Sequence, residues 1–285
     1  MDMTAQLGGT VSSAMHRDLE VVAQDSTIID SAVRMRERRI GSVLVGSVEP
    51  GGEGHSIVGI VTELDIVRKV IAEGVNASQT TVAQIMAKPL LTIAPDQPLL
   101  DASHVMETNH VRHLCVAEGG SIVGLVSVRD LVMYFVDAEA GPVRELDNVY
   151  RPLSVLMRTS IETIDQGETL EAAARRMAEK DVGSLLVSQT GKLVGIVTES
   201  DMVRKALAYN LDPRLIRIGS LMNHPVIDID INRTIHDASE LMAEKGIRHL
   251  AVMEINKIVG ILSVRDLIRM ISVRDQPRFL RERGK

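Results

Sequence analysis

The sequence contains four copies of one pattern, and this internal repetition restricts the fold more than any other feature. Each copy holds two methionines twenty residues apart: Met15 and Met35, Met86 and Met106, Met157 and Met177, and Met222 and Met242. Each copy closes on Gly, two apolar residues, Thr or Ser, two further residues and an aspartate: Asp65, Asp130, Asp201 or Asp266. Because the recurring pattern is long enough to hold several secondary-structure elements, it predicts a chain built from four similar supersecondary units.

The copies alternate, so the larger unit is a pair that is used twice. The first and third closing phrases contain Thr-Glu, whereas the second and fourth contain Ser-Val-Arg. We therefore expect two modules, and their predicted bounds are 10–140 (repeats 10–75 and 80–140) and 150–275 (repeats 150–210 and 215–275). A linker is expected near 137–152, a longer loop at the insertion 49–54, and a basic C-terminal tail at 276–285.

The third copy shows most clearly which elements form a repeat. Two ranges are predicted helices, 169–180 and 200–209, and three short apolar runs are predicted strands, 161–164, 184–187 and 193–197. The order strand, helix, strand, strand, helix predicts a mixed α/β (α+β) fold with a small three-stranded sheet in each repeat. Because about 55 residues bury little core alone, we expect the repeats to pair sheet to sheet.

Charge and composition argue against several classes of function. The formal net charge is −6 and only 2% of the residues are aromatic, so we expect neither a basic nucleic-acid footprint nor a base-stacking platform. No secretory signal or membrane span is expected, and the single cysteine, Cys115, fits a reducing compartment. We therefore expect a cytoplasmic protein without membrane or nucleic-acid partners. No metal-ligand spacing or catalytic constellation supports an enzyme, so we expect no catalytic or metal-binding residue.

The hydroxyl and carboxyl groups of the closing phrases are the main candidate binding residues: Thr62 and Asp65, Ser127 and Asp130, Thr198 and Asp201, and Ser263 and Asp266. A helix N-terminus favours an anion, a hydroxyl can donate to a phosphate or sugar oxygen, and a carboxylate one turn later can accept bonds from a ribose diol. The same Ser/Thr-x-x-acid pattern is also a capping box, in which both side chains satisfy the helix's own amides. The two roles are compatible, and the sequence leaves both open.

Basic residues recur in the second and fourth copies and are candidate phosphate ligands. The second strand there begins with Arg112-His113 or Arg248-His249, where the first and third copies have Gly-Ser. A further cation precedes the aspartate in the same two copies, at Arg129 and Arg265. Arginine can hold phosphate through two charge-assisted hydrogen bonds. We therefore expect phosphorylated ligands first at Asp130 and Asp266, with weaker or empty sites at Asp65 and Asp201.

Four more cations follow the aspartates of the first and third copies: Arg68, Lys69, Arg204 and Lys205. Because they continue along the second predicted helix, we expect them on its exposed face.

Over about residues 10–275 these motifs resemble the cystathionine-β-synthase (CBS) domain, whose tandem pair is called a Bateman module. The resemblance implies that the Thr or Ser contacts phosphate or sugar, and that the Asp contacts ribose hydroxyls, of adenosyl ligands between paired repeats. The Arg-His pairs resemble phosphate-binding residues of the four-repeat gamma subunit of AMP-activated protein kinase. AMP, ADP or ATP is therefore the expected regulatory ligand, and the cationic sulfur of S-adenosylmethionine is disfavoured beside Arg and His.

The main hypothesis is a regulatory nucleotide sensor that signals to a separate protein by conformational change. A second hypothesis is an interaction scaffold with vestigial ligand sites, and a third is a sensor of S-adenosylmethionine or cyclic di-AMP. We also expect a homodimer. The low aromatic content implies that a bound adenine would contact aliphatic walls and backbone amides rather than stacked rings.

Overall fold

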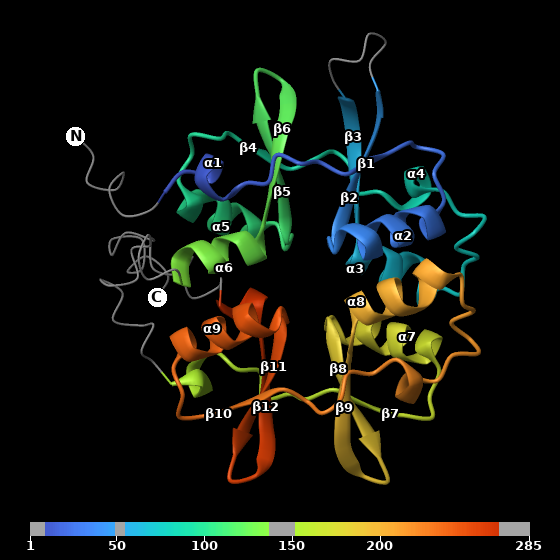
Figure 1. Cartoon of the computed structure of the whole chain (residues 1–285), viewed down its shortest axis with the longest axis vertical. Helices are drawn as coiled ribbons and strands as arrows, with labels where there is room; N and C mark the ends of the chain where they lie inside the picture. The colour runs from blue at the N-terminus through green and yellow to red at the C-terminus, as the bar shows by residue number, and fades with distance from the viewer. Residues whose placement is uncertain (1–8, 49–54, 137–151, 268–285) are drawn as a thin grey trace, which may run out of the picture. The chain divides into compact units, whose positions relative to one another are not determined.

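The computed structural model describes residues 9–48, 55–136 and 152–267 (Figure 1). Nearly all of the expected linker, the whole 49–54 insertion and the C-terminal tail therefore lie outside the described residues. Within the described part, the chain forms four three-stranded sheets, one for each copy of the sequence pattern, called repeats 1 to 4 below. The mixed α/β class and the order strand, helix, strand, strand, helix are confirmed.

The elements of repeats 1 and 2 correspond closely to one another. Those of repeat 1 are α1 (Val11–Ala14), β1 (Val21–Val22), α2 (Ile28–Arg38), β2 (Ser42–Val48), β3 (His55–Thr62), α3 (Glu63–Ile66) and the π-helical turn η2 (Val67–Ile71). Those of repeat 2 are α4 (Val82–Ile85), β4 (Thr92–Ile93), α5 (Leu99–Thr108), β5 (His113–Glu118), β6 (Ser121–Ser127) and α6 (Val128–Val136).

Repeats 3 and 4 follow the same order. Those of repeat 3 are the 3-10 turn η4 (Leu153–Val155), β7 (Thr163–Asp165), α7 (Leu170–Lys180), β8 (Ser184–Gln189), β9 (Lys192–Thr198), α8 (Glu199–Asp201), the π-helical turn η5 (Met202–Ala206) and the 3-10 turn η6 (Leu207–Tyr209). Those of repeat 4 are the 3-10 turn η7 (Ile218–Ser220), β10 (Asp228–Asp230), α9 (Ile235–Lys245), β11 (His249–Glu254) and β12 (Lys257–Ser263), followed by a helical turn over residues 264–267.

Each sheet has one parallel and one antiparallel strand pair. The short first strand pairs parallel to the second strand, across the first long helix, and the second and third strands form an antiparallel hairpin. In repeat 3 the hairpin turns tightly at Thr190 and Gly191, whose φ values of 47° and 79° suit a two-residue turn. The four sheets share one register irregularity, directly after the valine that pairs with the glycine of the closing phrase.

The first long helix of each repeat buries one apolar stripe. In α7 the buried residues are Leu170, Ala173, Ala174 and Met177, which is the i, i+3, i+4, i+7 spacing of a helix face. The same spacing recurs in α2, α5 and α9, and it always ends on the second methionine of the sequence pattern. These methionines are therefore core residues.

The first methionine of each pair packs against a glycine of a different repeat. A Cβ built at Gly124 of repeat 2 would lie 2.6 Å from the Met15 sulfur, and one at Gly59 of repeat 1 would lie 2.5 Å from the Met86 sulfur. Met157 and Met222 meet Gly260 and Gly195 in the same way. Glycine is therefore required where an extended segment crosses the third strand, and repeats 1 and 2 exchange their first segments, as do repeats 3 and 4.

The described chain forms two compact units. Unit 1 contains the described residues of the ranges 1–17, 91–160 and 228–285, and unit 2 contains those of 18–90 and 161–227. Unit 1 thus holds the sheets of repeats 2 and 4, and unit 2 holds those of repeats 1 and 3. The modules expected at 10–140 and 150–275 stay a prediction.

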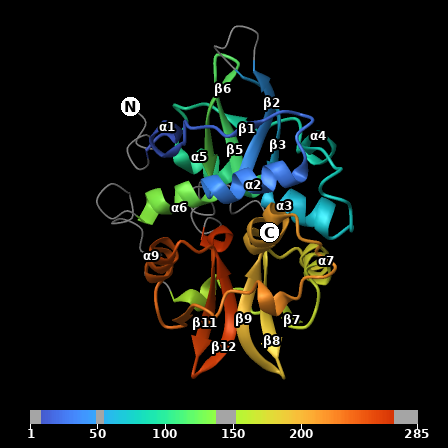
Figure 2. The same ribbon diagram turned by 45° about the vertical axis from the view of Figure 1, so that its right-hand side comes forward.

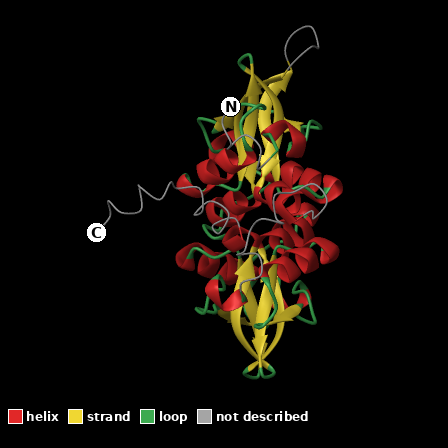
Figure 3. Cartoon of the chain, turned by 90° about the vertical axis from the view of Figure 1, so that its left-hand side faces the viewer, coloured by secondary structure: helices red, strands yellow, loops and turns green. Residues whose placement is uncertain are grey.

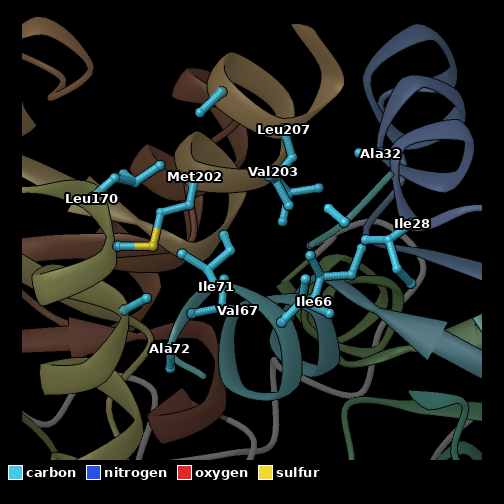
Figure 4. Packing of buried hydrophobic residues seen from close by; sticks show 14 of the residues in the cluster. Ile28, Ala32, Ile66, Val67, Ile71, Ala72, Leu170, Met202, Val203 and Leu207 are labelled. Carbon is cyan, nitrogen blue, oxygen red and sulfur yellow. The ribbon is translucent and has the colours of Figure 1, made fainter. Parts of the chain in front are cut away.

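Within each unit the helices lie between the two sheets (Figures 1 and 3). In unit 1, α6 lies beside α9, as Figures 1 and 2 agree. In unit 2, α2 packs against η6 and α7 packs against η2. Figure 4 shows the resulting aliphatic core, in which Val67 of repeat 1 lies near Met202 and Val203 of repeat 3. Helices from two repeats therefore bury a core that one repeat could not complete.

Candidate functional site

The aspartate of each closing phrase folds back onto the start of its own helix. One carboxylate oxygen accepts the backbone N–H of the Thr or Ser three residues earlier, at 3.0 Å for Asp65, 2.7 Å for Asp130, 2.9 Å for Asp201 and 2.9 Å for Asp266. The hydroxyls of Thr62, Ser127, Thr198 and Ser263 donate to the same oxygen. The capping box is complete in repeats 1 and 3, where the aspartate N–H also donates to the threonine hydroxyl, and its carboxylate half is present in all four repeats.

The second oxygen of each aspartate contacts a positively charged or titratable group. In repeats 1 and 3 it is a lysine one turn later on the same helix, with Lys69 Nζ 2.7 Å from Asp65 and Lys205 Nζ 2.8 Å from Asp201. In unit 1 the group comes from an exchanged segment: His16 Nε2 lies 2.8 Å from Asp130, and Arg158 Nε lies 3.2 Å from Asp266. A sugar hydroxyl at either unit 1 aspartate would therefore compete with His16 or Arg158.

His16, Arg158 and Asn223 were not predicted from the sequence as neighbours of these aspartates. Each directly follows the first methionine of its copy, and Asn223 donates to both oxygens of Asp201 at 2.9 Å. The repeat alignment places these three residues in equivalent positions, with Ala87 as the fourth. The alignment alone, however, assigns each of them to the wrong partner, because the segments are exchanged between repeats.

Positive charge gathers around His249 in unit 1. The pKa of His249 is lowered to about 3, first because burial disfavours the charged imidazole and then because Arg248, Arg112, Arg158 and Arg265 repel it. Arg112 belongs to repeat 2, whereas Arg248 and Arg265 belong to repeat 4. The predicted cations of these two repeats are thus brought together in one compact unit, and Arg158 joins them. We call Arg112, Arg158, Arg248, His249 and Arg265 the basic cluster.

The other predicted phosphate ligands have different surroundings. Arg129 is exposed, and its guanidinium donates to the carbonyl of Gly246 at 3.0 Å, at the end of α9 in repeat 4. His113 is half-buried at the start of β5, directly after Arg112. The role of both residues in phosphate binding stays a prediction.

In unit 2, arginines of the second helices pair with carboxylates of the other repeat. Arg204 Nε donates to Glu63 Oε1 at 2.7 Å, and the Glu63 side chain is only 1% exposed. Arg68 pairs with Asp181. The expectation that Arg68 and Arg204 lie on an exposed face is therefore wrong, because the helices that carry them pack against the other repeat of the unit. Lys69 and Lys205 are exposed, as expected.

Neither a reactive thiol nor a group of metal ligands is present among the described residues. Burial raises the pKa of the Cys115 thiol to about 11, which keeps it protonated and unreactive near neutral pH. Among the described residues, no group of three or more His, Cys, Asp or Glu side chains could hold a metal ion. The described helices are also too short or too polar for any of them to cross a membrane.

Comparison with known families identifies the repeated unit. The model of the CBS domain matches residues 11–72, 82–137, 153–208 and 218–273. The CBS domain-containing protein CBSCBSPB2 of Arabidopsis thaliana is 25% identical over 260 residues, which are 82% of this chain and 48% of that protein. The meiotically up-regulated gene 70 protein of Schizosaccharomyces pombe is 26% identical in an alignment 317 residues long, which covers 90% of this chain and 42% of that protein. The chain thus spans less than half the length of these relatives.

Two solved structures share the fold over most of the chain. A Methanocaldococcus jannaschii protein, described as a proposed archaeal homologue of g-AMPK, has a TM-score of 0.74 at 21% identity and covers 92% of this chain and 99% of its own. An uncharacterized conserved protein from Pyrococcus horikoshii has a TM-score of 0.60 at 20% identity with the same two coverages. At these identities the likeness concerns the fold.

Proposed function

The chain belongs to the CBS-domain family, with four copies of the domain, and we propose that it is a regulatory protein that binds an adenine nucleotide and signals the bound state to a separate protein. The observation that carries this proposal is the basic cluster of unit 1. Four arginines from different parts of the chain lie near enough to one histidine to repel its protonated form. Such a cluster favours a ligand with several negative charges, as AMP, ADP and ATP have.

The aspartates of unit 1 extend the proposed site toward the sugar. Asp130 and Asp266 each use one oxygen for the helix cap and present the other to His16 or Arg158. A carboxylate oxygen has about two acceptor positions, so the second oxygen can accept one sugar hydroxyl beside the existing partner or two after that partner moves. Asp130 is the more accessible of the two, with a side chain that is 12% exposed against 3% for Asp266.

Calorimetric titration with AMP, ADP and ATP tests the proposal on the wild type and on variants with Arg112→Ala, Arg248→Ala, Asp130→Ala or Asp266→Ala. Loss of one charge-assisted hydrogen bond, worth about 1.5–3 kcal/mol, should weaken binding roughly ten- to hundredfold. Arg214→Ala is the matched control, because Arg214 is an exposed arginine that pairs with Asp212 in unit 2. Unchanged affinity in all four site variants would contradict the proposal.

A scaffold without ligand is the second candidate, and the helix caps made by the four aspartates favour it. If the closing phrases serve only to cap helices, no nucleotide will stabilise the fold. A ligand at a hundred times its Kd stabilises a protein by about 2.7 kcal/mol. Thermal melting with and without each nucleotide therefore separates the two candidates.

The same titration includes S-adenosylmethionine and cyclic di-AMP as alternative adenosyl ligands. We expect S-adenosylmethionine to bind weakly, because its sulfonium charge is repelled by the basic cluster. The regulated partner, a homodimeric state and a cytoplasmic location belong to the proposal as well. Light scattering of the purified chain checks the dimer.

A further inference from the structure

The two units carry opposite charge at equivalent positions. The first residue of the second helix in each repeat donates its backbone N–H to the residue before the second strand: Glu63 to Gly41 at 3.0 Å, Glu199 to Gly183 at 3.2 Å, Val128 to Arg112 at 3.0 Å and Val264 to Arg248 at 3.1 Å. Unit 2 thus combines glutamate with glycine where unit 1 combines valine with arginine. The replacements are paired, and together they exchange a carboxylate side chain for a guanidinium side chain.

We propose that Glu63 and Glu199 are specificity-determining residues that exclude phosphate groups from unit 2. This inference rests on the proposed nucleotide binding in unit 1. Both glutamates are buried, at 1% and 3% exposure. A second anion beside a buried carboxylate would be strongly repelled, since charges interact strongly where water is scarce. By this inference, each glutamate carboxylate keeps phosphate away from a helix start that is equivalent to the one at Val128 or Val264 in unit 1.

Two arginines of the second helices in unit 2, Arg204 and Arg68, are already held by carboxylates of the protein. Arg204 binds Glu63 and also donates to the carbonyl of Ile40 at 2.9 Å. Arg68 binds Asp181. A phosphate would have to separate Arg204 from Glu63, and this would leave a buried carboxylate without its cation. In unit 2 the guanidinium of Arg204 is thus balanced by a buried carboxylate of the protein itself.

The decisive experiment removes the two negative charges in a background that lacks the arginines of unit 1. The background variant is Arg112→Ala/Arg248→Ala, and the test variant adds Glu63→Gln and Glu199→Gln, which keep the side-chain volume. ATP and inorganic pyrophosphate are titrated separately, so that a requirement for the nucleoside is distinguished from binding of phosphate alone. Glu73→Gln/Glu179→Gln in the same background is the control, because both glutamates are exposed in unit 2 and their loss removes the same two negative charges.

We expect the test variant to bind pyrophosphate and ATP at least tenfold more tightly than the background variant, and the control to match the background. A folded test variant without this gain, or an equal gain in the control, would overturn the inference. Failure of the proposed function is a separate outcome, because it appears as absent nucleotide binding by the wild type.

A second measurement covers the case in which the glutamine variants do not fold. Wild-type protein is photolabelled with 8-azido-ATP, and the labelled peptides are mapped. The inference expects labels in residues 91–160 or 228–285, and labels concentrated in 18–90 or 161–227 would overturn it.

Discussion

Protonation of His249 should make the stability of the ligand-free protein depend on pH. The folded protein lowers the pKa of His249 from 6.5 to about 3, through burial first and the four surrounding arginines second. Between these two values the unfolded chain binds the proton and the folded chain does not. The stabilising contribution of neutral His249 is therefore complete above pH 6.5 and is lost as the pH falls toward 3.

The size of the effect follows from the two pKa values. Lowering the pH from 7.5 to 5.0 should reduce the free energy of unfolding by about 2 kcal/mol through His249 alone. Urea denaturation of the wild type and of His249→Gln at both pH values measures this contribution, because the other titrating groups are common to the two proteins. His104→Gln, which replaces an exposed histidine of the same unit, is the control for the loss of a histidine as such.

Two results would refute the reasoning about His249. One is the same pH dependence in the wild type and in His249→Gln. The other is titration of the His249 ring near pH 6.5 in NMR spectra of the ligand-free protein. If a nucleotide binds as proposed, its phosphate should raise the pKa of His249, and the wild type should lose less stability at pH 5.0 when ATP is present.

Two further predictions concern packing and turns. Gly195→Ala would place a Cβ 2.6 Å from the Met222 sulfur and 2.9 Å from the carbonyl oxygen of Asn223. We therefore expect urea denaturation to show a loss of about 1–3 kcal/mol in the free energy of unfolding, and adding Met222→Ala should recover part of it. A loss below about 0.5 kcal/mol would contradict the close approach. Ile255 is 92% exposed and has a φ of 46°, a conformation unfavourable for a β-branched residue. Ile255→Asn should therefore stabilise the protein by about 1 kcal/mol, and Ile255→Val, which keeps the β-branch, should not; equal melting temperatures for the two variants would argue against strain at this turn.

The elements of a repeat were predictable because they depend on local patterns. Helix α7 was expected at 169–180 and spans Leu170–Lys180, and the expected hairpin around Gly191 is present. The apolar spacing of the helix and the turn residues of the hairpin each involve positions only a few residues apart, so the sequence alone indicates them. The four hydroxyl–carboxylate pairs were also found from sequence, together with their capping alternative.

What the sequence did not predict depends on contacts between distant segments. Arg204 was assigned to an exposed face, because an amphipathic pattern shows which face is polar but not which helix covers it. The contact between His16 and Asp130 joins residues 114 positions apart. The closing glycine gave a usable signal in retrospect, since a glycine repeated inside a strand marks a close backbone approach.

The exchange of first segments has a consequence for how this chain can be divided or can diverge. Unit 1 is assembled from three stretches of sequence and unit 2 from two, so the chain passes between them four times. No single proteolytic cleavage or truncation releases either unit intact, and deletion of one repeat removes the methionine that packs on the glycine of another. We therefore expect one repeat expressed alone to leave uncovered the part of its third strand on which the exchanged segment packs. We also expect repeats to be gained or lost in pairs during evolution.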